Sequence, residues 1–501
     1  MNIAHNTITN SIASFLGFLS LAISAFIVTP YTINQLHDTR YGVYAILFAV
    51  TGLLNFLDFG LAYSSIRFIT EARETGDLSK LNRIINMNVI IFIGVGVGLV
   101  MLTIVVMQPV IQIMNIPSEL YAETRLALLL AVMSLPAFLI MSVYNAVLQA
   151  YQKFTTINIV LIINTILFTS VTFLVLYYQP SVVNLMAVNL GSAATLMLTY
   201  LVITKITLPT YRISIVFDYA IFKQLFSFSA STFFIIIANR LLFQVDRLFV
   251  SWLYGPSYVA YYSIPSAVGT KIHGTIANIN QILFPLSAAF DTQKRTAELI
   301  SLYIKATKVN LVGLVAMGVP LVVYSDKLIE LWLGQAYVGP CGFLLKLSVI
   351  GYSLFSLTSI QTSFLAGFNK QKQSMYFMVG IALSNITLLL LFTPTWGLPG
   401  AALAFIGAHW VLLLMQRYTE RQLKIGWLFQ ATVWLRTLPV IVLSASVLYL
   451  TLPAIQHVSA LLLSLVMAGC GIIALSSIVM LNQEDRTIFL SYIKKLIPSK
   501  A

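Results

Sequence analysis

The chain has 501 residues, of which 59% are apolar and only 9% are charged. Soluble domains carry about 25% charged residues, so this composition excludes a soluble fold and predicts an all-α polytopic membrane protein. The net charge of +13 does not indicate a nucleic-acid binder, because the lysines and arginines lie in short segments between long apolar runs.

Apolar runs of about 20 residues, separated by polar breaks, predict about 14 transmembrane helices. In chain order they lie near 8–32, 41–65, 84–107, 124–150, 157–178, 184–204, 224–253, 258–286, 307–325, 340–366, 374–393, 399–416, 437–455 and 458–481. The first run lacks the basic segment that precedes a cleaved signal peptide, so we expect it to remain as a transmembrane helix.

Basic residues divide unequally between two sets of loops. The loops after even-numbered helices, with the C-terminal tail, hold 22 of the 29 lysines and arginines. The other loops hold 4, namely Arg40, Arg125, Lys327 and Lys346. We call these two faces the basic side and the opposite side. Because cytoplasmic loops carry the excess of positive charge, both termini are predicted to be cytoplasmic. All loops on the opposite side are short, which argues against an extracytoplasmic catalytic domain.

An internal repeat is predicted from two matches at one spacing. Residues 148–153 (LQAYQK) resemble 365–370 (LAGFNK), and 41–44 (YGVY) resemble 258–261 (YVAY), in both cases 217 positions apart. Each copy has six helices, an even number, so the two copies must have the same topology. The predicted organisation comprises an N-lobe (1–204), a cytoplasmic linker (205–223), a C-lobe (224–416), two appended helices (437–481) and an amphipathic tail on the cytoplasmic leaflet (482–501). The substrate path is expected between the lobes.

Five charged residues remain inside the predicted helices, namely Asp58, Arg240, Asp246, Arg247 and Lys271. A charge at the centre of a bilayer costs roughly 2.5–3.5 kcal/mol on insertion scales. Such groups therefore face a hydrated cavity or one another.

The three cations form the candidate substrate site. Arg240 and Arg247 are seven residues apart, two helical turns, so they share one helix face with Gln244. Lys271 lies in the middle of the next helix. Guanidinium groups bind phosphate bidentately and an ammonium adds a point charge, so an anionic head group such as a pyrophosphate is the matching ligand.

Structural interpretations of the same charges stay open. Asp246 could neutralise Lys271, and Asp58 could belong to a purely structural ion pair. Arg247 could extend to the outer head groups, and His273 and His409 are more often packing residues than proton relays. Arg240 is the hardest to explain without a cavity.

Sites of other kinds are not indicated. No Ser-His-Asp set, metal cluster or catalytic carboxylate pair is recognisable, so we expect a protein that is not an enzyme and holds no metal. Cys341 and Cys470 are far apart and predict apolar packing rather than a disulfide.

Two segments carry a family resemblance. Residues 57–61 (LDFGL), followed by Arg67 and the charged stretch 70–77 (TEARETGD), resemble the polysaccharide-transport family. This family contains flippases for O-antigen and other lipid-linked repeat units, within the multidrug/oligosaccharidyl-lipid/polysaccharide (MOP) exporter superfamily. Residues 245–255 (VDRLFVSWLYG), leading into Tyr261 and Tyr262, resemble the corresponding segment of the second copy. The resemblance covers nearly the whole chain, from Ile8 to about Leu481.

The resemblance implies transport by alternating access of an undecaprenyl-pyrophosphate-linked glycan. It also implies a coupling ion, H⁺ or Na⁺, for which Asp58 or Asp246 is a candidate carrier, and polysaccharide assembly proteins as partners. Cationic cavity residues are typical of this branch, in agreement with Arg240, Arg247 and Lys271. Two alternatives remain, a cation-coupled small-molecule exporter of the same superfamily and a membrane glycan enzyme or assembly scaffold.

Overall fold

The computed structural model describes residues 3–215, 218–426 and 428–480, and the predicted tail at 482–501 lies outside them. Within the described residues every regular element is a helix, as the composition predicts. Ten helical segments there are long and apolar enough to cross a membrane, and α7 (Tyr219–Tyr254), which bends by 61° after Ser227, makes an eleventh.

The fourteen predicted helices are all present. Two of the ten segments, Leu16–Glu74 and Gln371–Gln422, contain two predicted helices each, and the helix predicted at 258–286 is α8 (Pro256–Asn280), which is not among the ten. The helix axis breaks inside the first at His37 and inside the second at Gly397, where the backbone leaves the helical region. The chain is therefore a multi-pass membrane protein, with helices joined by very short turns.

Contacts within the chain group it into two compact units, Met1–Tyr261 and Tyr262–Ala501. The lobe boundaries read from the sequence stay predictions. The first unit contains α1 (Ile3–Leu54), η1 (Asn55–Asp58), α2 (Leu61–Glu74), α3 (Leu78–Ile113), η2 (Ser118–Leu120), α4 (Tyr121–Ala150), α5 (Phe154–Tyr178), α6 (Val182–Thr207) and α7, and α8 (Pro256–Asn280) begins in it. The second contains the rest of α8, then α9 (Leu283–Thr292), α10 (Thr296–Val323), α11 (Ser325–Leu333), η3 (Gln335–Tyr337), α12 (Val338–Ser356), α13 (Thr358–Gly367), α14 (Gln371–Ala408), α15 (Trp410–Gln422), α16 (Leu428–Thr451), η4 (Leu452–Ala454) and α17 (Val458–Met480).

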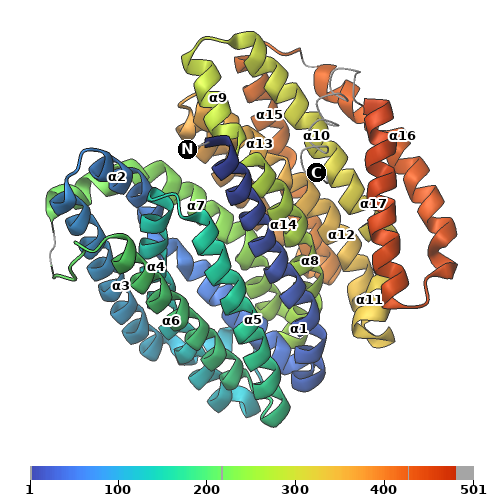
Figure 1. Cartoon of the computed structure of the whole chain (residues 1–501). Helices are drawn as coiled ribbons and strands as arrows, with labels where there is room; N and C mark the ends of the chain where they lie inside the picture. The colour runs from blue at the N-terminus through green and yellow to red at the C-terminus, as the bar shows by residue number, and fades with distance from the viewer. Residues whose placement is uncertain (1–2, 216–217, 427, 481–501) are drawn as a thin grey trace, which may run out of the picture. The chain divides into compact units, whose positions relative to one another are not determined.

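Packing within each unit joins helices that are distant in sequence. In the first unit α4 lies between α3 and α6, and α1 lies along α5 (Figure 1). In the second unit the appended helices α16 and α17 lie side by side and both contact α10. The appended pair is thus part of the second unit's packing.

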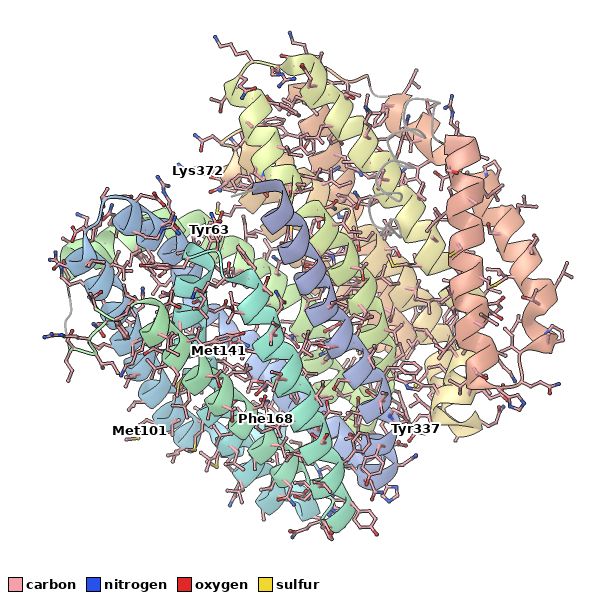
Figure 2. All side chains as sticks on the ribbon, viewed as in Figure 1. Tyr63, Met101, Met141, Phe168, Tyr337 and Lys372 are labelled. Carbon is pink, nitrogen blue, oxygen red and sulfur yellow. The ribbon has the colours of Figure 1, made fainter. Side chains whose placement is uncertain are left out.

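Side-chain polarity is distributed as expected for a membrane solvent. α3 presents a band of exposed apolar side chains that includes Val97, Met101 and Val105, the last 77% exposed. Figure 2 labels Met101 on this helix. Asn86 and Asn88, on the same helix, are buried and hydrogen-bonded. Polar groups find partners inside the bundle because lipid offers none, and the exposed apolar band faces lipid.

The predicted helix at 41–65 is not continuous. α1 ends at Leu54, η1 follows, and Phe59 and Gly60 both have left-handed backbone before α2 begins. Asp58 is the last residue of η1, so this intramembrane carboxylate lies in the break rather than on a regular helix face. Non-helical backbone at membrane depth is tolerated only where protein or a hydrated cavity satisfies its hydrogen-bonding groups. The break at Phe59 and Gly60 is therefore expected to lie against protein or a hydrated cavity.

Backbone conformation repeats along the chain in step with the sequence. Four residues with positive φ in the first half have a counterpart 217 to 219 positions later, namely His37 with Gly255, Gly76 with Lys294, Asn115 with Gly334, and Gln152 with Asn369. Each marks a turn between two helices. The same four turns thus recur at the spacing of the two matched sequence segments.

Candidate substrate site on helix α7

Helix α7 carries two of the three predicted cations and is defined at both ends. Asp218 caps its start by accepting the backbone N–H groups of Ala220 and Ile221. Gly255, with φ of 85°, ends it. Leu242 and Val250 are fully buried on the helix, and this apolar packing fixes the orientation of the remaining faces.

Arg240 lies opposite the break in the second predicted helix. Its guanidinium interacts electrostatically with the carboxylate of Asp58, and among the described residues the two groups form no ion pair within 4.0 Å. One carboxylate oxygen of Asp58 accepts the backbone N–H of Ala62 at 3.3 Å, at the start of α2. The sequence predicts Asp58 and Arg240 separately, and the structure brings them together.

The break is held against α7 by contacts of the two residues that follow Asp58. The hydroxyl of Ser229 donates to the carbonyl oxygen of Gly60 at 3.0 Å. The ring of Phe59 lies 5.5 Å from that of Phe233 and 6.4 Å from that of Phe226, measured between centroids. A polar contact and aromatic packing therefore keep Asp58 on the cationic side of α7.

Two turns further along α7, Gln244 and Arg247 form the second polar level of this face. A Cβ added to Gly52 of α1 would lie 2.7 Å from Nε2 of Gln244, so only glycine leaves room for this amide. Nη1 of Arg247 donates to Oε1 of Gln244 at 3.4 Å, and Nε of Arg247 is buried without a hydrogen-bond partner. A buried guanidinium donor without an acceptor suits an anionic ligand.

Asp246 and Lys271 differ from this arrangement. Asp246 is 2% exposed, and its carboxylate accepts the backbone N–H of Arg247 at 2.8 Å. Lys271 lies in the second unit, half-buried on α8, where its carbonyl accepts the hydroxyl of Thr275 at 2.9 Å. Their pairing with each other, and the roles of both in binding or coupling, stay predictions.

The histidines of the second unit lie among aromatic side chains. The ring of His273 is 4.5 Å from that of Phe355, and Nδ1 of His409 is 2.6 Å from the carbonyl oxygen of Phe405. These contacts agree with the packing role expected for both. Among the described residues no group of three or more His, Cys, Asp and Glu side chains is placed to hold a metal ion.

Comparison with known proteins places this chain in a family. The family model described as "Polysaccharide biosynthesis protein" matches residues 7–290, more than half of the chain. The chain belongs to the polysaccharide biosynthesis protein family. A family relative described as "Putative O-antigen transporter", from Shigella flexneri, is 24% identical over 411 residues, which cover 79% of this chain and 94% of that protein.

Solved structures show the fold that this member of the polysaccharide biosynthesis family adopts. "Lipid II flippase MurJ, inward closed conformation" is 17% identical with a TM-score of 0.73, covering 94% of this chain and 98% of its own. An inward-facing multidrug resistance MATE transporter of the MOP superfamily is 13% identical with a TM-score of 0.69, covering 81% and 98%. The resemblance to the MOP superfamily is therefore confirmed for the fold.

Proposed function

We propose that this protein is a flippase that moves undecaprenyl-pyrophosphate-linked oligosaccharide repeat units from the cytoplasmic to the periplasmic leaflet. The observation that carries the proposal is the polar face of α7, where two arginines lie at membrane depth in a member of a polysaccharide biosynthesis family. Relatives and structural neighbours are transporters and flippases by name, which supports a transport function rather than an enzymatic one.

The diphosphate is the part of the substrate that the cations recognise. Arg240 has Asp58 as a built-in counter-charge, which makes the guanidinium tolerable in the membrane while the site is empty. A diphosphate brings more negative charge than one carboxylate and accepts bidentately from a guanidinium, so it replaces Asp58 as the partner of Arg240. Each such charge-assisted hydrogen bond contributes about 1.5–3 kcal/mol.

Translocation follows by alternating access, with the polyprenyl tail in lipid throughout. The head enters from the basic side, which carries 22 of the 29 basic residues and which we assign to the cytoplasm of a bacterial cell, together with both termini. Lys271 adds a third cation, and Asp58 or Asp246 carries a coupling ion, H⁺ or Na⁺. Polysaccharide assembly proteins receive the unit after transport.

A small-molecule exporter is the second candidate, because the same fold occurs in multidrug transporters. Cationic drugs call for acidic sites, whereas the membrane-embedded cations here outnumber the membrane-embedded acids by three to two. A glycan enzyme or assembly scaffold is weaker still, since it would leave the arginines on α7 without a role.

The deciding experiment measures the leaflet in which lipid-linked repeat units reside in cells lacking this protein. The expected result is accumulation of intact units on the cytoplasmic leaflet and loss of surface polymer, both restored by the wild-type gene. Normal sidedness in a strain without other flippases would refute the proposal. Resistance to cationic drugs in the same strain separates the exporter, and altered glycan structure with normal sidedness separates the enzyme.

A further inference from the structure

Two turns between helices meet on the opposite side of the first unit. The first turn joins the two halves of α1 at His37, and the second joins α7 to α8 at Gly255. We call residues 37–42 and 254–261 the turn pair. The hydroxyl groups of Thr39 and Ser257 are 3.0 Å apart, and the phenol of Tyr261 donates to Oδ2 of Asp38 at 2.6 Å.

The turn pair is in close contact along its whole length. A Cβ on Gly42 would lie 1.8 Å from the carbonyl oxygen of Pro256, so the two backbones touch there. Beside it, the hydroxyl of Ser251 donates to the carbonyl of Met114 at 2.7 Å, and the amide of Asn115 donates to the carbonyl of Trp252 at 2.5 Å. These contacts join the C-terminal ends of α3 and α7.

The contact lies between equivalent parts of the repeat. Thr39 and Ser257 are 218 residues apart, the same spacing as the two positive-φ residues of the turns, His37 and Gly255. The turn pair therefore joins, within the first unit, two turns that are equivalent in the predicted repeat.

One bond of the turn pair breaks this symmetry. Tyr44 corresponds to Tyr261 in the sequence match, but at the 218-residue spacing of the turns the counterpart of Asp38 is Pro256, whose side chain cannot accept a hydrogen bond. The bond from Tyr261 to Asp38 thus occurs once, at one edge of an otherwise symmetrical contact.

We propose that the turn pair is the gate on the opposite side, closed in this structure, and that the hydrogen bond from Tyr261 to Asp38 sets its strength. This inference rests on the proposed function, because alternating access requires the contact to separate once in each cycle. A contact made by hydroxyl groups and backbone atoms suits a gate that opens and closes in each cycle. Each neutral hydrogen bond contributes only about 0.5–1.5 kcal/mol and exchanges readily for water when the turns part.

A reversible crosslink tests whether the turns must separate. In a background with the two native cysteines replaced, Cys341→Ala and Cys470→Ser, the pair Thr39→Cys and Ser257→Cys is oxidised and translocation of lipid-linked glycan is measured. We expect at least a tenfold loss that a reducing agent reverses. The matched control pair is Ser24→Cys and Thr169→Cys, whose hydroxyls are 2.6 Å apart on α1 and α5. This pair lies within one predicted lobe and should transport at the rate of the background whether oxidised or reduced.

Full transport by the crosslinked turn pair would overturn the gate. A second measurement needs no substrate and separates this inference from the proposed function. On intact cells carrying a single Thr39→Cys, a membrane-impermeant maleimide should react about fivefold faster when Tyr261→Phe removes the bond to Asp38. The control Tyr44→Phe should leave the rate unchanged. Equal labelling rates in the Tyr261→Phe and unmodified backgrounds would refute the role assigned to this bond, whether or not the protein proves to be a flippase.

Discussion

The two copies of the repeat share their turns but not their charges. Arg240, Arg247 and Lys271 lie in the second copy, and the positions 217 residues earlier hold Ile23, Pro30 and Leu54. A duplicated scaffold thus carries its membrane-embedded cations on one copy only. The comparison teaches that the turns follow the predicted repeat, while the charged residues of the candidate site lie where the predicted copies differ.

The acids are not confined to one copy, since Asp58 lies in the first and Asp246 in the second, but only Asp58 lies at a break in its helix. Asp58 lies in the break of the first copy's second helix, and the residue 217 positions later is Thr275, within the regular helix α8. The first copy therefore supplies Asp58 as a counter-charge to Arg240 from a break in the helix, and the second copy has no break at the corresponding position. Four measurements test this contrast.

The largest effect is expected from reversing the charge of Arg240. Arg240→Glu places two carboxylates opposite each other and removes the proposed phosphate ligand, so export of surface polymer should fall by about 100-fold or more. Lys223→Glu, an exposed basic residue near the start of the same helix, is the matched control and should export normally. Membrane insertion is measured for both, and normal export by an inserted Arg240→Glu protein would remove α7 from the substrate site.

A buried polar network allows the two copies to be compared at equivalent positions. Asn86 donates to the carbonyl of Arg212 at 2.8 Å and to the hydroxyl of Ser214 at 3.0 Å, and it accepts from Tyr211 at 3.2 Å. These bonds fix the segment after α6 onto α3. The corresponding residue of the second copy, Tyr303, accepts from Gln361 at 3.3 Å.

Asn86→Ala should therefore lower the free energy of unfolding by about 3 kcal/mol, because several partners lose their bonds together. Tyr303→Phe keeps the ring and removes one hydroxyl, which interacts with Gln361, Glu420 and Gln430, so it should cost about 1–2 kcal/mol. Thermal unfolding in detergent measures both. Burial and the hydrogen bond to Tyr144 raise the pKa of the Tyr211 phenol, so the phenol stays neutral and the difference should persist at alkaline pH. Equal losses would show that the two networks stabilise their copies alike.

A double-mutant cycle tests whether Asp58 is the counter-charge of Arg240. Arg240→Gln leaves the carboxylate of Asp58 without its cation, and we expect a loss of about 2 kcal/mol in unfolding free energy. Adding Asp58→Asn should recover about half of that loss, since the amide still accepts the N–H of Ala62. Additive losses in the double variant would show that the two charges act independently.

The sequence predicted the number of helices and the charged residues better than it predicted their neighbours. Apolar run length is set by membrane thickness, so fourteen spans could be counted from hydropathy alone. Helix ends were less certain, and α16 begins at Leu428 although its apolar run was placed from residue 437. A helix can extend beyond the lipid as a polar segment, and apolar content does not record this.

The site shows the same limit. The spacing of Arg240 and Arg247 placed both on one face, because helical periodicity is a local property. The interaction of Arg240 with Asp58 and the close approach of Gln244 to Gly52 depend on how α7 packs against α1 and on the break at Phe59 and Gly60, which are tertiary properties. The one local signal was the glycine of the LDFGL segment, since left-handed backbone favours glycine.

The smallest effect concerns the backbone of the turn pair. His37 has φ of 58° and ψ of 170°, a conformation that is essentially confined to glycine, whereas the equivalent turn of the second copy uses Gly255. A residue with a side chain costs roughly 1–3 kcal/mol in this region. Gly255→Ala should therefore lower the unfolding free energy by about 1 kcal/mol, and His37→Gly should raise it by up to about 1 kcal/mol. If His37→Gly instead destabilises the protein, the histidine side chain makes contacts whose loss outweighs the relief of backbone strain. The two turns would then differ in side-chain contacts as well as in having His37 in one and Gly255 in the other.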